Sequence, residues 1–310
     1  VCVCAVRGNF DDAQTGVKKI FSAVSKDQLL EGKGVRLSSA NSINIGRLAP
    51  QVVYYYRAYA DLVQAGRIQP GDKVDYVVPT GNFGDILAGY FAKEMGLPVG
   101  KLVCASNANN VLTEFLRTGR YDRRRPFYKT VSPSMDILVS SNLERLLYLL
   151  SGDDKLIADL MKQLSENGEY EVPADMLEKL HELFWAGFCD DEGAKTAIGK
   201  VWKDDHYLCD THTAVAWDVA QQYKQANPEH NAVVVLSTAS PYKFPAAVLE
   251  GIGEKAEGDE FDVMEQLHKV TGVPVPKNLA DLRSRAVRHR DVIARGEMLD
   301  YVLGKAAAEK

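Results

Sequence analysis

The sequence has little excess charge of either sign and no long apolar run. Of its 310 residues, 37 are lysine or arginine and 42 are aspartate or glutamate, a formal net charge of −5. A nucleic-acid scaffold would carry long basic runs, whereas the densest one here is "DRRRP" at 122–126. No apolar segment reaches the roughly 20 residues of a membrane-spanning helix. We therefore expect neither nucleic acid nor a membrane as partner.

Cysteine is scarce. There are five, an odd number, and only Cys2 and Cys4 lie close together. A zinc site would need a second close pair of cysteine or histidine, and His206 with Cys209 is the one candidate, so we expect no metal. Reduced, buried thiols in a cytoplasmic protein are the simplest interpretation.

Apolar segments alternate along most of the chain between the strand and helix patterns. Strands are expected at 1–8, in "GVRLSSA", "KVDYVVP" and "GKLVCAS", and in "NAVVVLSTAS", with helices between them. This alternation predicts an α/β fold with a mostly parallel sheet and helices on both faces. The most apolar strands should be adjacent and nearly fully buried, through Val77, Val78, Leu102, Val103, Val233, Val234 and Val235.

The pattern changes to successive helices between about 140 and 226. They are expected at 142–151, 153–167, 175–186, 191–203 and 211–226. We interpret this region as a helical insertion between sheet strands. The resulting division is the remainder of a smaller α/β subdomain at 1–45, a large α/β domain at 46–260, and a helical tail at 261–310.

A glycine-rich turn joins a buried strand to a helix in "VVPTGNFGDILAGYFAKEMG", residues 77–96. A helix N-terminus offers free N–H groups and partial positive charge, and glycines let an anion approach closely. The turn residues therefore indicate a phosphate cup, formed by Gly81, Asn82, Phe83 and Gly84. There is no P-loop lysine and no Gly-x-Gly-x-x-Gly pattern, and a tight turn that binds nothing is the alternative.

Polar residues gather at a second junction, "SSANSINIGRLAPQ", residues 38–51. Asn41, Ser42 and Asn44 can form short hydrogen bonds, and Arg47 offers a bidentate fork for a phosphate or carboxylate. For any one of them, helix capping or a solvated arginine is the simpler interpretation. Four such residues within seven positions favour an anion pocket.

Together these stretches resemble threonine synthase, a pyridoxal-phosphate enzyme of fold type II, the tryptophan-synthase-β class. The matching stretches occur in family order from about Gly8 to Phe244, and the chain beyond Leu249 matches weakly. They are "GNFDDAQ", "SANSINIGRLAPQ", "PTGNFGDILAGYFAKEMGLP", "ASNANNVLTEFLRTG", "SPSMDILVSSNLERLLY", "CDTHTAVAW" and "STASPYKF".

The resemblance implies roles for matching residues. The loop from Gly81 to Asp85 resembles the one that wraps the phosphate of pyridoxal 5'-phosphate, and Thr238 resembles the hydroxyl residue at the pyridine nitrogen. On spacing alone Thr238 could equally be an ordinary strand-end threonine. The residues similar to those that grip the substrate phosphate are Asn41, Ser42 and Arg47. Departures from the family at Thr211, Ser240 and Tyr242 leave His212 and Lys243 without an assigned role.

One expected element is absent. The family's Schiff-base lysine lies in a Phe-Lys-Asp context upstream of the matching stretches, and neither Lys26 nor Lys203, each followed by aspartate, has the expected His-Gly-Pro-Thr lead-in. The chain also starts at Val1, without methionine, in a strand-like run. We therefore expect the C-terminal portion of a threonine synthase, with no catalytic residue of its own and no activity alone.

For the parent enzyme the resemblance implies conversion of O-phosphohomoserine and water to threonine and phosphate, in a cytoplasmic monomer or homodimer. A phospho-lyase that eliminates phosphate to a 2-oxo acid shares these motifs. A catalytically silent fragment is a further alternative. A dinucleotide-binding α/β protein is disfavoured because the chain lacks its glycine fingerprint and ribose-binding acid.

Overall fold

The computed structural model describes residues 2–8, 10–32 and 34–308, and the chain forms two compact units. The first unit combines Val1–Ala40 with Lys277–Lys310, and the second is Asn41–Pro276. The domain division expected from the sequence, with boundaries at 45/46 and 260/261, stays a prediction. Every residue of the predicted phosphate site belongs to the second unit.

The first unit joins segments from the two ends of the chain. Strand β1 (Cys4–Val6) pairs in parallel with β8 (Asp291–Ile293), and α1 (Phe10–Lys26) packs against α14 (Met298–Ala308). The approach of these helices is close, since a Cβ on Gly16 would lie 2.3 Å from Met298 Sδ. The short helical elements α13 (Lys277–Ala280), η4 (Leu282–Ser284) and η5 (Arg295–Glu297) complete it. Residues 34–40 contain no strand, so the one expected in "GVRLSSA" is wrong.

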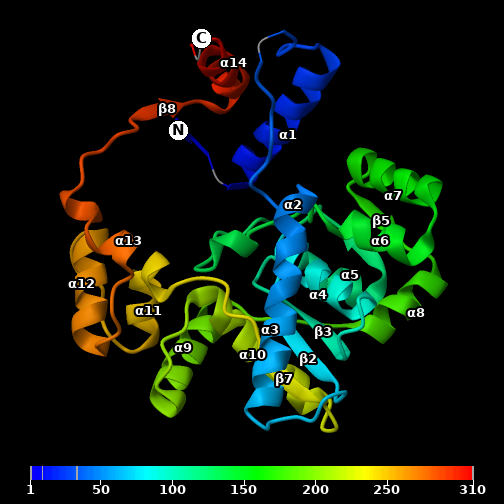
Figure 1. The fold of residues 1–310 in the computed structure, drawn as a ribbon, viewed down its shortest axis with the longest axis vertical. Coiled ribbons are helices and arrows are strands. Elements are labelled where there is room, and N and C mark those ends of the chain that lie inside the picture. Colours follow the sequence, from blue (N-terminus) through cyan, green and yellow to red (C-terminus); the bar gives the residue numbers. More distant parts are fainter. Residues whose placement is uncertain (1, 9, 33, 309–310) are drawn as a thin grey trace. The chain divides into compact units, whose positions relative to one another are not determined.

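The second unit is built on a four-stranded parallel sheet (Figure 1). Its order is β6 (Phe184–Phe188), β3 (Val99–Ser106), β2 (Val74–Pro79) and β7 (Ala232–Val235). Helix α10 (Thr211–Ala226) packs on one face, where Trp185 meets Tyr223. The other face is covered by α4 (Gly84–Glu94), α5 (Val111–Thr118) and α8 (Ala174–Leu183). The expected α/β architecture with helices on both faces is confirmed.

Further helices extend this unit. The helical segment expected between "GVRLSSA" and "KVDYVVP" is divided into α2 (Ile45–Leu48), η1 (Ala49–Gln51) and α3 (Val52–Gln64), with Pro50 in the short 3₁₀ segment. The remaining elements are η2 (Pro133–Met135), α6 (Leu143–Ser151), α7 (Asp154–Glu166), α9 (Asp191–Asp205), η3 (Pro241–Lys243), α11 (Pro245–Gly251) and α12 (Glu260–Thr271). No helix in the described ranges is both long and apolar enough to span a membrane.

The region expected to be wholly helical contains strands. The helix predicted over 175–186 ends at Leu183, and "FWAGF" continues as β6, which pairs with β3 inside the main sheet. Aromatic residues favour strands, but no glycine or proline separates this run from the preceding helix. A small antiparallel pair, β4 (Arg120–Asp122) with β5 (Glu169–Glu171), also lies outside the main sheet.

The burial of the central strands agrees with the sequence only in part. Val77, Val78, Leu102 and Val103 are fully buried on adjacent parallel strands, as predicted. Residues 233–235 lie in the expected parallel strand but are only partly buried, so the expectation of full burial is wrong there. The reason is that β7 pairs with β2 on one side and forms the edge of this sheet. A continuous apolar run therefore did not indicate a central position.

A buried carboxylate fixes the amino-terminal end of the sheet. Asp75 Oδ2 accepts hydrogen bonds from the Tyr223 hydroxyl at 2.8 Å and from Asn231 N at 3.1 Å, while Oδ1 accepts from Lys101 N at 2.7 Å. Asp75 is fully buried, so water does not reach its carboxylate to replace these hydrogen bonds. One side chain thus connects three strands and α10.

Replacing Asp75 by alanine should lower the free energy of unfolding by about 3–5 kcal/mol, because several buried donors lose their acceptor. Urea denaturation of both proteins measures this. Asp61→Ala is the control: its carboxylate pairs with Arg57 on the exposed side of α3, and its removal should cost far less. Equal losses in the two variants would contradict the role given to Asp75.

Candidate phosphate site

The predicted site residues lie at the carboxyl edge of the second unit's sheet. Val77 pairs with Val235, and Leu236 N donates to Val77 O at 3.0 Å. Thr80 and Thr238 each follow three residues later, so the turn after β2 and the end of β7 meet at the same edge. Thr238 is exposed there. This is the edge at which parallel α/β sheets bind ligands.

The turn between β2 and α4 is tight and strained at one position. Phe83 has φ of 62°, a left-handed conformation that is uncommon for a residue other than glycine. Its ring is fully buried and contacts Phe184 with centroids 5.7 Å apart, which holds the turn in place. Asn82 Oδ1 accepts a hydrogen bond from Gly84 N at 3.0 Å, so the first N–H group of α4 has a side-chain partner.

Both glycines of the turn are required by close approach. A Cβ on Gly84 would lie 2.3 Å from Ser42 Oγ and 2.7 Å from Ser42 Cβ. A Cβ on Gly81 would lie 2.7 Å from the carbonyl oxygen of Ser134. The turn therefore has two other segments pressed against it, one from residues 41–44 and one from the loop that contains η2.

Ser42 forms the contact between the first of these segments and the turn. Its side chain is buried, and its Oγ accepts from Asn82 Nδ2 at 3.0 Å and from Asn142 Nδ2 at 3.1 Å. Asn41 Oδ1 accepts from Ile43 N at 3.1 Å. Asn44 Oδ1 accepts from Gly46 N at 3.0 Å and caps α2, which packs against α4.

The start of α6 closes the site from a third direction. Ser140 Oγ donates to Gly81 O at 2.9 Å, and Asn142 donates to Asn82 O through N at 3.0 Å and through Nδ2 at 2.9 Å. Arg145 Nη1 donates to Ser42 O at 3.0 Å and to Asn142 Oδ1 at 2.8 Å. Nη2 of the same arginine donates to the carbonyl of Ile43.

A buried pair anchors the η2 loop near Thr238. His212 Nδ1 lies 3.2 Å from Asp210 Oδ1, and its Nε2 accepts from Ser134 N at 3.2 Å. Asp210 also caps α10, Thr213 Oγ1 donates to Asp210, and the same oxygen lies 3.2 Å from Ser237 Oγ. Although burial raises the pKa of Asp210, its hydrogen bonds from His212 and Thr213 give a net lowering. The pair links α10, the end of β7 and the loop against Gly81.

Comparisons with known proteins follow this geometry. Residues 213–299 match the family model described as threonine synthase, C-terminal. The threonine synthase of Pseudomonas aeruginosa is 38% identical over 289 residues, which cover 92% of this chain and 58% of that protein. Threonine synthase-like 1 of Homo sapiens is 44% identical over 250 residues, 80% of this chain and 33% of that protein.

Solved structures give the same result over nearly the whole chain. The crystal structure of pyridoxal-phosphate-bound threonine synthase from Brucella melitensis is 36% identical, with a TM-score of 0.79 over 99% of this chain and 59% of that one. Yeast threonine synthase is 31% identical, with a TM-score of 0.78 over 100% of this chain and 60% of that one. The chain is thus similar to threonine synthases over nearly its whole length. It spans about a third of the like-1 protein and somewhat over half of the threonine synthases.

The structure brings most of the predicted site residues together. Asn41 and Ser42 lie against the turn from Gly81 to Asp85, and Thr238 ends the neighbouring strand. Asn44 caps helix α2, which is the simpler of the two interpretations drawn from the sequence. Arg47 is exposed on α2. The roles given to all of these residues remain predictions.

Sequence reasoning missed Ser140, Asn142 and Arg145. They belong to "SSNLER", inside a stretch that matches threonine synthase, but no local pattern assigns them to the turn. Their partners are 59 to 103 positions away in the chain. The signal that could have found them is a polar Ser-Ser-Asn group directly before an amphipathic helix, where capping residues are common.

Asp85 places an unusual carboxyl group in this threonine-synthase-like turn. Burial raises its pKa from 3.8 to about 6, against a smaller opposing effect of the hydrogen bond from Tyr55. The Tyr55 hydroxyl donates its shorter hydrogen bond, at 2.7 Å, to the main-chain carbonyl of Asp85. Since the folded pKa lies above the unfolded one, the group stabilises the fold most below about pH 4, and this contribution is lost as the pH rises through 6.

In the unaltered chain the free energy of unfolding should therefore fall by about 3 kcal/mol between roughly pH 4 and pH 7. The Asp85→Asn variant should not show this fall. Denaturant titrations across this range measure the slope. Asp159→Asn, at an exposed position of α7, should leave the slope as it is. A slope in Asp85→Asn equal to that of the unaltered chain would show that the buried carboxyl does not titrate in this range.

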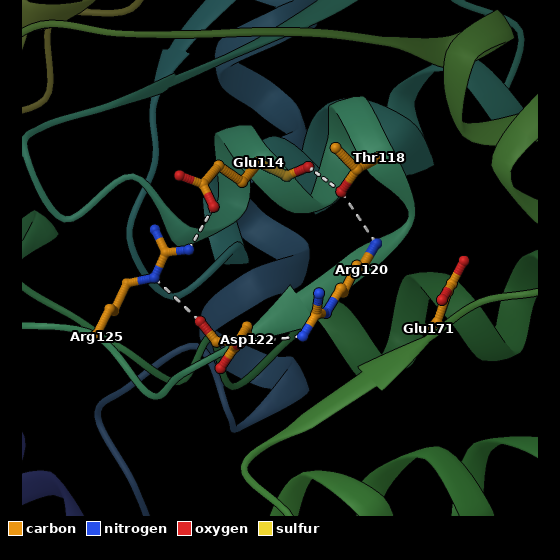
Figure 2. Close-up of a pocket in the computed structure, with 6 residues that line it drawn as sticks. All are labelled: Glu114, Thr118, Arg120, Asp122, Arg125 and Glu171. Carbon is orange, nitrogen blue, oxygen red and sulfur yellow. Dashed lines mark hydrogen bonds and ion pairs between the residues drawn. The ribbon is translucent and has the colours of Figure 1, made fainter.

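The basic "DRRRP" segment lies elsewhere in the second unit. It adjoins a cavity of about 430 Å³ between α5, β4 and β5, lined by Glu114, Thr118, Arg120, Asp122, Arg125 and Glu171 (Figure 2). Arg120 forms an ion pair with Glu169, Arg124 with Asp122, and Arg125 with Glu114. The pairing raises the pKa of the arginines at 120 and 124. The segment thus connects β4 to β5 and leaves little net charge at this cavity.

Proposed function

We propose that this chain supplies the phosphate-binding part of a pyridoxal-phosphate enzyme that converts O-phosphohomoserine and water to threonine and phosphate. The observation that carries the proposal is the convergence of three segments on one helix start: the turn from Gly81 to Asp85, the loop at Asn41 and Ser42, and the beginning of α6. The pyridoxal-phosphate-bound relative from Brucella melitensis supports the choice of cofactor.

The residues present fit the cofactor. The start of α4 offers a favourable dipole and the N–H groups that follow Gly84 to a phosphate, and the missing side chains of Gly81 and Gly84 let Ser134 and Ser42 pack against the turn. Thr238 is an exposed hydroxyl at the same sheet edge. As the partner of the ring nitrogen it is neutral, so it does not force protonation there as a carboxylate would. When bound, the cofactor would supply an electron sink for charge that develops on the substrate carbon.

The chain's own part in the reaction is to bind and orient. Asn41, Ser42 and Arg47 would hold the substrate phosphate and stabilise its charge as it leaves. No catalytic residue is assigned to this chain, because no lysine here has the family's context. We further propose a cytoplasmic protein that acts as a monomer or homodimer.

Binding experiments on the chain test this proposal directly. O-phosphohomoserine should perturb the amide NMR signals of residues 41–47 and 81–85 in the presence of pyridoxal phosphate, and homoserine should not. The two ligands differ only in the phosphate, so an equal response to both would contradict the substrate assignment.

A phospho-lyase is the second candidate. Identity does not decide against it, because the relatives named threonine synthase-like 1 are 43–44% identical to this chain, against 38% for the Pseudomonas aeruginosa threonine synthase. Products decide between the two. With this chain fused to the portion of the Pseudomonas enzyme that it does not match, threonine would indicate the synthase, and 2-oxobutyrate would indicate the lyase.

A further inference from the structure

The hydrogen-bond ladder between β2 and β7 ends before it reaches the predicted cofactor residues. Its last main-chain bond among the described residues runs from Leu236 N to Val77 O, at 3.0 Å. Gly81 and Thr238 both lie beyond this bond in the chain. The ladder therefore does not itself set their separation, and other contacts must do so if one ligand is to touch both.

The phosphate turn rests on the η2 loop. A Cβ at Gly81 would lie 2.7 Å from Ser134 O and 3.2 Å from Met135 Cα, so main chain packs directly on main chain here. The far side of the loop is attached to the end of β3, because Asp136 Oδ1 accepts from Asn107 Nδ2 at 2.8 Å. A displacement of the loop would therefore move the surface on which the turn is packed.

His212 attaches the same loop to α10. Ser134 N donates to its Nε2 at 3.2 Å. Its Nδ1 lies 3.2 Å from Asp210 Oδ1, with Thr211 Oγ1 farther away at 3.4 Å. A main-chain N–H only donates and an ionised carboxylate only accepts, so the imidazole is neutral and carries its proton on Nδ1. The buried ring contacts Phe244, with centroids 5.2 Å apart, and thus aims a fixed acceptor at the loop.

From Asp210 the contacts continue to the end of β7. The carboxylate accepts a hydrogen bond from Thr213 Oγ1, and that oxygen lies 3.2 Å from Ser237 Oγ. The same serine oxygen lies 3.0 Å from the Tyr207 hydroxyl. Ser237 directly precedes Thr238 in the chain. Polar contacts therefore lead from the η2 loop, through the start of α10, to the residue beside Thr238.

We propose that Asp210 and His212 are positioning residues that set the distance between the phosphate turn and Thr238. A ligand held at both ends binds more tightly when its two contacts are already spaced to match it, since less free energy is spent on ordering them. The pair thus favours a ligand that carries a phosphate and a pyridine ring on one rigid frame over phosphate alone. That these two groups bind at these two places rests on the proposed function. The match in spacing is what the pair adds.

The test compares His212→Asn with His212→Gln in the full chain. Asparagine keeps a polar group beside Asp210 but is too short to reach Ser134 N, whereas glutamine extends to the place of Nε2 and can accept there. Two probes are titrated by isothermal calorimetry. One is pyridoxine 5'-phosphate, which has no aldehyde to react with lysines, and the other is inorganic phosphate.

His212→Asn should weaken pyridoxine 5'-phosphate by about tenfold, the effect of one lost hydrogen bond in a buried site. Inorganic phosphate should weaken by less than about twofold, because it does not reach Thr238 and the turn keeps its bonds with Ser42 and Ser140. His212→Gln should recover most of the lost affinity. A side chain that only stabilised the fold would not separate the two probes in this way.

His181→Asn is the matched control. His181 Nε2 also contacts a main-chain group, Leu116 O at 3.0 Å, but it lies on α8, outside these contacts. The ratio of the two affinities should not change. If His212→Asn does not fold, Thr213→Val, which is nearly the same shape, breaks the connection at its β7 end and should give the same pattern.

The outcomes separate the two proposals. If the unaltered chain binds neither probe, the proposed function fails, and the spacing role fails with it. If the unaltered chain binds both and His212→Asn leaves the ratio of their affinities as it was, the phosphate site stands but the spacing role is wrong. A lower ratio in His212→Asn, with recovery in His212→Gln and no change in His181→Asn, supports the role.

Discussion

Gly84→Ala should weaken phosphate binding by about two orders of magnitude or more. The added Cβ would lie 2.3 Å from Ser42 Oγ and 3.1 Å from Asn82 Oδ1, so Ser42 must move and its bonds with both asparagines must break. Loss of two or three charge-assisted hydrogen bonds to an anion accounts for an effect of this size. Titration of the variant with pyridoxal phosphate and with inorganic phosphate measures it.

The fold should survive this substitution. Alanine is the better helix former by about 1 kcal/mol, which offsets part of the cost of overpacking, itself about 1–3 kcal/mol. Gly304→Ala is the control, since among the described residues no heavy atom outside the local helix backbone lies within 4 Å of a Cβ added to this glycine of α14. It should leave binding unchanged. Unaltered phosphate affinity in Gly84→Ala would exclude the turn as the anion site.

The chain alone should form no stoichiometric covalent adduct with pyridoxal phosphate and should not turn over O-phosphohomoserine. Covalent capture requires a lysine amine beside the bound aldehyde, usually with a lowered pKa. Burial does lower the pKa of Lys93 and Lys101. Both amines, however, donate hydrogen bonds to main-chain carbonyls. The acceptor for Lys93 is Val99 O, at the beginning of β3. That is the opposite end of the strands from Thr238 and the turn.

Borohydride reduction followed by peptide mass mapping tests this expectation. The Pseudomonas aeruginosa threonine synthase serves as the positive control under the same conditions. Scattered, substoichiometric labelling of exposed lysines, such as Lys203 on α9, is compatible with the account. One fully labelled lysine together with phosphate release from O-phosphohomoserine would contradict it.

The fold was largely predictable because parallel strands covered on both faces need continuous apolar runs. Two runs of this kind, β2 and β3, were placed and buried as expected. The sequence did not distinguish the edge strand β7 from a central one, because the number of neighbours of a strand is a tertiary property. It also concealed β6, whose aromatic run directly continues a helix without a breaking residue.

The site was predictable where one local pattern carries the chemistry. The glycine turn and the Asn-Ser pair are such patterns, and the structure joins them through Ser42 and Asn82. Arg145 could not be assigned, since its role arises from contacts with carbonyl groups about a hundred positions away. Asp85 carries a raised pKa for the same kind of reason: the packing of Tyr55 and α4 around it buries it.

The central claim is that the turn from Gly81 to Asp85, with Ser42 against it, binds a phosphate group. The most direct measurement is the affinity of the chain for pyridoxal phosphate compared with pyridoxal, which lacks only the phosphate, with inorganic phosphate as a competitor. We predict that pyridoxal phosphate binds at least about a hundredfold more tightly than pyridoxal and that inorganic phosphate displaces it. Equal affinities for the two pyridoxals, or no displacement by phosphate, would contradict the account.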